Sequence, residues 1–323
     1  MTRRLWRPLV GLAFAIAFGW LLARGLDWRA VRMVLTGAFP GPLLVGLVLL
    51  AVGFAARIAR WWWMLRPLAP ALPFTRCVRP FLASLALNNT LPFRAGDVAR
   101  TVAFRDELGV PPGQVLGTLV IERVLDLVAL LVLLGVGLGV TAAGELPRAL
   151  VAGAALAGAV AVLGLAVAVA VPSATIARWQ QRLGGGRVAE FLGHAAEALA
   201  PLRSAGQVMR LLALSLVAWT LEGAMYAAVA ISLTVGAAPF APWLALAAGT
   251  LSTLLPGTPG YVGTFDYFAA RGMMAGGAGA AQATAFALLV HAMLWVPVTA
   301  VGGLLLVPLR GERVARRARA EAV

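Results

Sequence analysis

The sequence contains no lysine and little charge of either sign. Its 27 basic residues are all arginines, charged residues make up only 12% of the chain, and hydrophobic residues make up 61%. Several apolar stretches are longer than eighteen residues, which is typical of transmembrane helices rather than of a soluble core. We therefore predict an all-α polytopic membrane protein that forms a single membrane domain over residues 1–323.

Catalytic and ligand-binding motifs are also scarce. A single cysteine, Cys77, excludes an internal disulfide and a cysteine metal cluster. The chain has two histidines and no GxSxG, HExxH or Walker sequence, so we expect no enzymatic activity, no cofactor and no metal site. The net charge is +14, but most arginines flank apolar stretches. That placement favours membrane topology and anionic lipid headgroups over nucleic acid as the reason for the charge.

Six segments are long enough to cross a membrane as helices: residues 5–23, 42–65, 112–141, 147–171, 208–235 and 279–307. Two further apolar segments, 73–109 and 241–274, each contain a short helix, a Pro/Gly interruption and a second short helix. No arm of either segment spans ~30 Å of hydrocarbon at ~1.5 Å per residue. We predict two re-entrant helical hairpins, or eight spans if the hairpins are counted as crossings.

The two interruptions are similar in sequence. Residues 87–96 are LNNTLPFRAG and residues 251–260 are LSTLLPGTPG, with Leu, Leu, Pro and Gly matching at an offset of 164 positions. Each half has the order span, span, broken hairpin, span, which predicts a first repeat at 5–143 and a second at 147–308. Three crossings per half make the repeats inverted. The distribution of arginines, including the basic tail 309–323, predicts that both termini are cytoplasmic.

Interrupted helices at corresponding places in inverted halves indicate a transport site, because unwound backbone is tolerated in a membrane only where protein or a water-filled cavity lines it. We expect the two interruptions to form opposing walls of such a cavity. Arg94 and Arg100 flank Asp97 around Gly96, and guanidinium groups near a restarting helix favour a phosphate ligand. The alternative interpretation is a cytoplasmic loop at residues 88–100 that binds nothing.

Charged residues also occur deep in the expected spans. Glu122 lies ~15 Å along its helix, with Asp126 on the same face and Arg123 beside it. These charges form a structural ion pair, such as Arg123 with Asp126, or contact a substrate. Glu222 has no charged neighbour on its own helix, so it has a partner on another helix or exchanges protons. His291 is a second candidate for proton coupling, against a purely structural role.

The sequences NNTLPFRAGDVAR, ERVLD and LLPGTPGYVGTFD together resemble the lysylphosphatidylglycerol synthase transmembrane family. This is a flippase-like domain that is also found in the multiple peptide resistance factor. The resemblance covers about residues 5–308, with Asp97 standing where glutamate is commoner. It implies a substrate-binding set of Asn88 or Asn89, Pro92, Arg94, Gly96, Asp97, Arg100, Glu122, Arg123, Asp126, Pro256, Gly260, Gly263 and Asp266.

The soluble synthase domain associated with the family is not in this sequence, so the resemblance implies lipid handling rather than lipid synthesis. We predict a flippase-like transporter of the bacterial inner membrane that moves a phospholipid or glycolipid between leaflets. The alternative is a membrane-embedded enzyme or a scaffold of a lipid-linked glycan or hopanoid pathway. A membrane lipid with an anionic or zwitterionic headgroup is the expected partner, since Asp97, Glu122 and Asp126 would attract a cationic group as the arginines attract a phosphate. A lipid-modifying enzyme or glycosyltransferase and a second copy of the chain stay open as further partners.

Overall fold

The computed structural model describes residues 6–24, 26–91, 94–141, 186–199, 202, 204–255 and 258–307, with isolated positions between 152 and 182. Every regular element in these ranges is a helix. The expected span 147–171 is described only at isolated positions. Pro92, Pro256 and the tail 309–323 lie outside the described residues.

Five of the expected spans coincide with long helices to within three residues. These helices are α1 (Trp6–Ala23), α3 (Pro40–Leu65), α7 (Pro112–Thr141), α11 (Ala205–Ser232) and α14 (Ala280–Leu304). Within the described ranges, α3, α11 and α14 are long and apolar enough to cross a membrane. A multi-pass helical membrane protein is therefore confirmed, while the total of six crossings stays a prediction.

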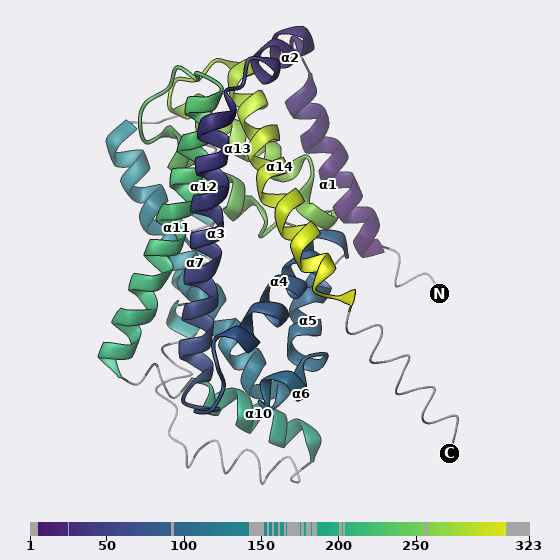
Figure 1. Ribbon diagram of the computed structural model, residues 1–323, viewed down its shortest axis with the longest axis vertical. Coiled ribbons are helices and arrows are strands. Elements are labelled where there is room, and N and C mark those ends of the chain that lie inside the picture. Colours follow the sequence, from purple (N-terminus) through teal and green to yellow (C-terminus); the bar gives the residue numbers. More distant parts are fainter. Residues whose placement is uncertain are drawn as a thin grey trace.

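Both broken segments fold as the sequence predicts, into short helices separated by an interruption. The first contains α4 (Thr75–Thr90), α5 (Ala95–Val102) and α6 (Arg105–Leu108). The second contains α12 (Ala241–Ser252), the 3₁₀ turn η4 (Pro259–Tyr261) and α13 (Thr264–Ala275). In Figure 1, α4 and α5 lie in the lower half of the molecule and α12 and α13 in the upper half. The two hairpins thus occupy opposite halves along the long axis.

Close backbone contact explains two glycines of the hairpins. A methyl group at Gly96 would collide with the carbonyl oxygen of Ser84, so α5 lies directly on α4. A methyl group at Gly272 would lie 2.5 Å from the Cα of Ala245, so α13 lies equally close to α12. Glycine at these positions lets each pair of short helices pack with their backbones in contact.

The long helices pack around the antiparallel pair α3 and α11. The N–H of Phe39, just before α3, donates to the carbonyl of Ser232 at the end of α11 at 2.9 Å. Around this pair, α4 packs against α14, α12 packs against α7, and α10 (Arg187–Glu197) also packs against α7. The small helix α2 (Trp28–Thr36) begins at Asp27, whose carboxylate accepts the N–H groups of Arg29 and Ala30. The central pair positions the charged residues described below.

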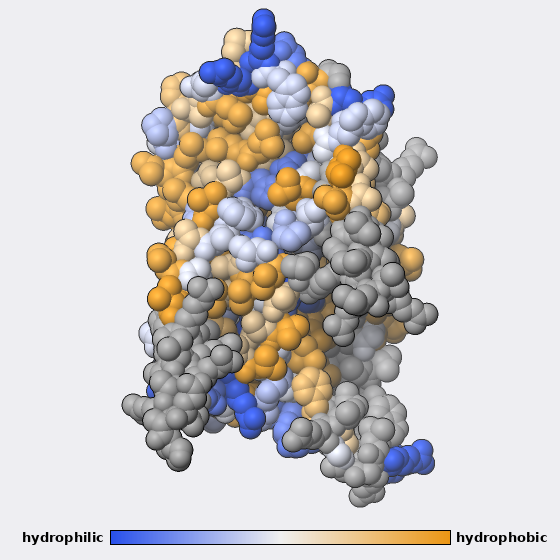
Figure 2. Space-filling view, turned by 90° about the vertical axis from the view of Figure 1, so that its right-hand side faces the viewer, coloured by the Kyte–Doolittle hydropathy of each residue, from blue (hydrophilic) through white to orange (hydrophobic). Residues whose placement is uncertain are grey.

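The described surface is largely apolar. On the face shown in Figure 2, hydrophobic residues predominate, hydrophilic residues lie at the two ends, and a band of hydrophilic to intermediate residues crosses the middle. On α3, Leu44, Val48 and Val52 recur every four residues and are 63%, 62% and 50% exposed. An exposed apolar stripe of this kind is unfavourable in water and fits a helix that faces lipid.

Candidate functional site

The centre of the molecule contains a network of charged side chains from three helices. Arg60 of α3 is fully buried, and its Nη1 donates to Oδ1 of Asp126 at 2.6 Å and to the hydroxyl of Ser215 at 2.7 Å. Its Nη2 lies 3.7 Å from Oε1 of Glu122. Glu122 and Asp126 are four residues apart on α7, so both carboxylates face the same arginine. One guanidinium therefore joins α3, α7 and α11.

Arg100 attaches the first hairpin to this network. Its Nη1 donates to Oε2 of Glu122 at 3.1 Å, and its Nε donates to the hydroxyl of Ser84 at 2.9 Å. The guanidinium lies 4.4 Å from the ring centroid of Phe81, within the range of a cation–π contact. Arg100 is fully buried, so its charge holds α5 in place and presents no surface to a ligand.

Asp97 is oriented by Asn88. The side-chain amide of Asn88 donates to Oδ1 of Asp97 at 2.9 Å, and its carbonyl accepts the Asp97 N–H at 3.2 Å. Nη2 of Arg123 lies 3.9 Å from both Asp97 Oδ1 and Glu122 Oε1. The partner of Asp126 is therefore Arg60 on another helix, rather than the neighbouring Arg123 that the sequence suggested.

Glu222 has a partner on another helix, one of the two alternatives that the sequence left open. Nη1 of Arg57 lies 2.6 Å from Oε2 of Glu222, and both side chains are nearly buried. The guanidinium of Arg57 also lies 4.3 Å from the ring centroid of Trp219. A buried pair of this geometry resists separation, because removing either partner leaves an uncompensated charge inside the protein.

A small pocket with both charged and apolar lining residues lies beside the charged network, where the two hairpin interruptions meet. It has a volume of about 160 Å³. Residues from both hairpins, α7 and α11 line it: Arg94, Arg123, Val124, Asp126, Leu127, Leu130, Trp219, Thr250, Leu251, Thr253 and Leu254. Nε of Arg94 donates to the hydroxyl of Tyr261 at 3.1 Å, and its Nη2 donates to Thr253 at 3.3 Å. We call this cavity the polar pocket.

Backbone strain marks the same place. Arg94 has φ +50° and Tyr261 has φ +57°, both in the left-handed region that non-glycine residues rarely adopt. Such conformations cost ~1–3 kcal/mol each and persist where the surrounding structure fixes them, frequently at functional sites. Here the two strained residues belong to different hairpins and share a hydrogen bond.

The second hairpin is attached to α14 by Asp266 and His291. Oδ2 of Asp266 accepts the Gly263 N–H at 2.8 Å at the start of α13, and its Oδ1 lies 2.7 Å from Nδ1 of His291. Nε2 of His291 lies 2.9 Å from the carbonyl oxygen of Gly260. Gly260 has φ +71°, a conformation that suits glycine. This cluster fixes the tip of the second hairpin.

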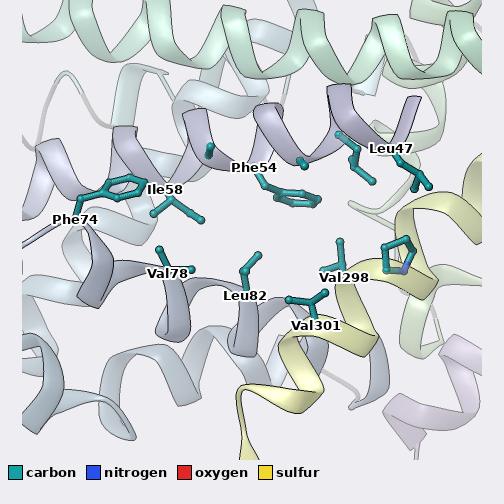
Figure 3. Close-up of a pocket in the computed structure, with 12 residues that line it drawn as sticks. Leu47, Phe54, Ile58, Phe74, Val78, Leu82, Val298 and Val301 are labelled. Atoms are coloured by element: carbon teal, nitrogen blue, oxygen red, sulfur yellow. The ribbon is translucent and has the colours of Figure 1, made fainter. Parts of the chain in front are cut away.

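A larger apolar groove lies between α3, α4 and α14, with a volume of about 500 Å³. Figure 3 shows Leu47, Phe54 and Ile58 of α3 facing Val78, Leu82, Val298 and Val301 across an open space. All twelve lining residues are apolar. Phe54 lies 5.6 Å from the guanidinium of Arg57, which also contacts Trp219 of the polar pocket. Arg57 therefore lies between the apolar groove and the polar pocket.

The structure brings most of the predicted site residues into two neighbouring clusters. The charged network and polar pocket contain Asn88, Arg94, Gly96, Asp97, Arg100, Glu122, Arg123 and Asp126, and the tip cluster contains Gly260, Gly263, Asp266 and His291. Asn89 is bound to α14 instead, since its side chain donates to Thr299 and its carbonyl accepts from Trp295. Pro256 lies outside the described residues.

Arg57 and Arg60 were not among the predicted site residues, because arginines beside apolar runs are expected to mark the cytoplasmic side. Both lie within α3 and are 7% and 0% exposed. Their position inside an apolar run was the available signal. The hydroxyl groups of Tyr261 and Thr253 were also missed. Among the described residues, no group of three histidine, cysteine or acidic side chains is placed to hold a metal ion.

These features define a multi-pass α-helical membrane protein with a buried charge network beside a polar pocket. The family model for the lysylphosphatidylglycerol synthase TM region matches residues 9–302. The chain therefore belongs to this family, which confirms the resemblance seen in its motifs and relates it to lipid handling. No curated relative matches the chain.

Proposed function

We propose that this protein binds the phosphate-bearing headgroup of a membrane lipid in the polar pocket and moves the lipid between leaflets. The proposal rests on the hydrogen bonds of the Arg94 guanidinium group. Its hydrogen-bond partners are the neutral hydroxyls of Tyr261 and Thr253, and no carboxylate of the described residues lies within ion-pair distance. A guanidinium held this way keeps its charge available for an anion.

The balance of charge around the pocket favours the same ligand. Five arginines are gathered there, namely Arg57, Arg60, Arg94, Arg100 and Arg123, against the four carboxylates of Asp97, Glu122, Asp126 and Glu222. One positive charge is in excess, beside the fully buried Arg60 and Arg100. A lipid phosphate would balance it, and Arg123, whose side chain is 41% exposed, would share the contact.

The apolar groove supports a lipid rather than a free anion. Leu47, Phe54, Pro297 and Val301 line it on α3 and α14, two of the helices that are suited to cross a membrane. An acyl chain resting there would bury apolar surface without meeting a polar group. The headgroup would lie on the other side of Arg57, in the polar pocket.

Movement between leaflets is supported by the way that corresponding helices are paired. If α3 corresponds to α11, α4 to α12 and α7 to α14, then the contact of α4 with α14 corresponds to that of α12 with α7. Arg57 and Glu222 are 165 positions apart and pair with each other, as residues beside a two-fold axis would. Inverted halves of this kind rock about a central site in transporters. We place both termini in the cytoplasm and the protein in the bacterial inner membrane.

The test measures lipid binding and transfer by the purified protein in vesicles of phosphatidylethanolamine with a labelled phosphatidylglycerol. Arg94→Gln should weaken binding of the labelled lipid by at least about tenfold, since a hydrogen bond to a charged group contributes ~1.5–3 kcal/mol. Arg94→Lys should bind the labelled lipid with intermediate affinity, because lysine keeps the positive charge and loses the planar set of donors of the guanidinium group. Arg66→Gln removes the same charge at an exposed position and should have no effect.

Equal binding and leaflet transfer by wild type and Arg94→Gln would contradict the proposal. A covalent change in the lipid would support a membrane-embedded enzyme, and the absence of both transfer and modification would support a scaffold. Thermal unfolding of each variant in detergent checks that the substitutions leave the fold intact.

A further inference from the structure

The side chain of His291 has two hydrogen-bond neighbours that are both acceptors. Nε2 faces the carbonyl oxygen of Gly260 at 2.9 Å, and a carbonyl can only accept. Nδ1 faces Oδ1 of Asp266 at 2.7 Å, and an ionised carboxylate can only accept. A neutral imidazole carries one N–H and satisfies only one of these neighbours.

The geometry therefore requires one proton more than a neutral histidine beside an ionised aspartate would hold. The proton resides on the ring, which is then imidazolium and donates twice, or on Asp266, which then donates to Nδ1. In both cases the pair carries a single added proton. The side chain of His291 is 15% exposed and that of Asp266 is 4% exposed, so the proton enters and leaves from the histidine side.

Two hydrogen bonds and one peptide bond connect His291 to Arg94 of the polar pocket. His291 holds the carbonyl of Gly260 at the tip of the second hairpin. The next residue is Tyr261, whose strained backbone positions the hydroxyl that accepts from Arg94. Loss of the proton removes a donor from Gly260 or from Asp266, so the tip loses one of its two attachments to α14.

Other titratable and charged groups occur on the elements packed against η4, α13 and α14. Glu222 of α11 is paired with Arg57 of α3, and Arg79 of α4 is paired with Glu107. The remaining groups are Arg210 and Tyr226 of α11, Tyr261 of η4, Tyr267 and Arg271 of α13, the exposed Arg29 and Arg32 of α2, Arg76 and Cys77 of α4, and Arg7 in the sequence of α1. Of these, Tyr226 lies within electrostatic reach of Asp266. No titratable residue occurs in α12.

We propose that Asp266 and His291 form a proton-binding site that latches the tip of the second hairpin against α14. Binding of a proton closes the latch and fixes Tyr261 beside Arg94, and release of the proton to water frees the tip. A coupling of this proton to lipid movement rests on the function proposed above. The proton site itself is independent of any lipid.

Nuclear magnetic resonance counts the proton directly, because the chain has only two histidines. The His194→Gln variant, labelled with ¹⁵N-histidine and purified in detergent, gives the signal of His291 alone. At about pH 7 we expect either two protonated ring nitrogens, or a ring protonated at Nε2 alone, whose unprotonated Nδ1 then accepts from a protonated Asp266. A neutral ring protonated at Nδ1 alone, which donates to an ionised Asp266, would overturn the proposal.

Cysteine labelling tests the latch. A Val262→Cys variant in a Cys77→Ala background places a thiol beside the tip, where Val262 is 57% exposed. A Met33→Cys variant in the same background is the reference, because Met33 is 67% exposed on α2 and reports the ordinary effect of pH on thiol reactivity. We expect the ratio of the two labelling rates to rise severalfold as pH increases and the proton leaves. A ratio that does not change with pH would contradict the latch.

The Asp266→Asn variant gives the matched control. Its amide donates to a neutral Nδ1 while its carbonyl still accepts from Gly263, so the latch stays closed without the added proton. The ratio of labelling rates should then be low at every pH, and the ring should be neutral. Both measurements are made without a lipid ligand. A negative result would therefore contradict the proton-binding latch and leave the proposed lipid binding untouched.

Discussion

The two hairpins use the same backbone device with different polar groups. The first carries its charges on its own segment, with Arg94 at the interruption and Asp97 and Arg100 within α5. The interruption of the second hairpin carries none, and Asp266 fixes it from the start of α13 together with His291 of α14. The comparison indicates that an interrupted helix requires fixed hydrogen-bond partners, which either its own segment or a neighbouring helix can supply.

The largest effect should come from breaking the buried ion pair of Arg60 and Asp126, which joins α3 to α7. Asp126→Ala leaves the fully buried Arg60 without its closest carboxylate, and we expect a loss of ~3–5 kcal/mol in stability. Thermal unfolding in detergent should show a large fall in the midpoint. Asp126→Asn keeps a hydrogen-bond acceptor for Arg60 and should lose less. Equal midpoints for Asp126→Ala and wild type would mean that α7 is held in place by packing alone.

Alanine substitutions at Gly96 and Gly260 should separate the cost of a steric clash from the cost of an unfavourable backbone conformation. Gly96→Ala drives a side chain into the carbonyl of Ser84, so we expect a loss of ~1–3 kcal/mol. Gly260→Ala meets Trp295 and also forces a non-glycine residue to φ +71°, with a cost in the same range.

Gly109 is the reference position for these two variants, since its φ is +65° and nothing lies within 4 Å of an added methyl. Gly109→Ala should show the conformational cost alone, about 1 kcal/mol. If the three alanine variants unfold at one temperature, close packing at the tips contributes nothing measurable.

An effect in the same range should come from Asn88, the polar residue that holds the first interruption. Asn88→Ala removes both hydrogen bonds to Asp97 and should cost ~1–3 kcal/mol. Ser252 lies at the offset position in the second hairpin and donates only to Gly249 of its own helix. Ser252→Ala should therefore change the unfolding midpoint by much less. A larger shift for Ser252→Ala would reverse the comparison between the hairpins.

The smallest effect should come from the hydrogen bond that joins the hairpins. Tyr261→Phe removes the acceptor of Arg94 Nε and keeps the ring, so stability should fall by only ~0.5–1.5 kcal/mol. Binding of labelled phosphatidylglycerol should weaken, because Arg94 loses one of the two partners that orient it. Unchanged binding would show that Thr253 orients Arg94 by itself.

The sequence predicted the helices well, because long apolar runs and Pro/Gly interruptions are local features of the chain. It also predicted most members of the clusters, since charged residues in apolar segments are rare and stand out. The partners could not be predicted in the same way. Arg60 meets Asp126 across 66 positions and Arg94 meets Tyr261 across 167, and such contacts depend on how helices pack.

The burial of Arg57 and Arg60 is the clearest case of a feature that could not be predicted from the sequence. Arginines near the end of an apolar run commonly mark the cytoplasmic boundary, so topology was the natural interpretation. Their burial depends on acids from α7 and α11, which lie far away in the sequence. Periodicity along α3 contains no information about those acids.

The pair of Arg57 and Glu222 also restricts how the chain could be assembled from its halves. Under the proposed two-fold relation these residues occupy equivalent places beside the axis. A dimer made from two copies of the first half would set one guanidinium against another, and two copies of the second would oppose two carboxylates. Under that relation each half would be complementary to the other and unsuited to self-association, and covalent fusion of the two unlike halves would bring each to its counterpart.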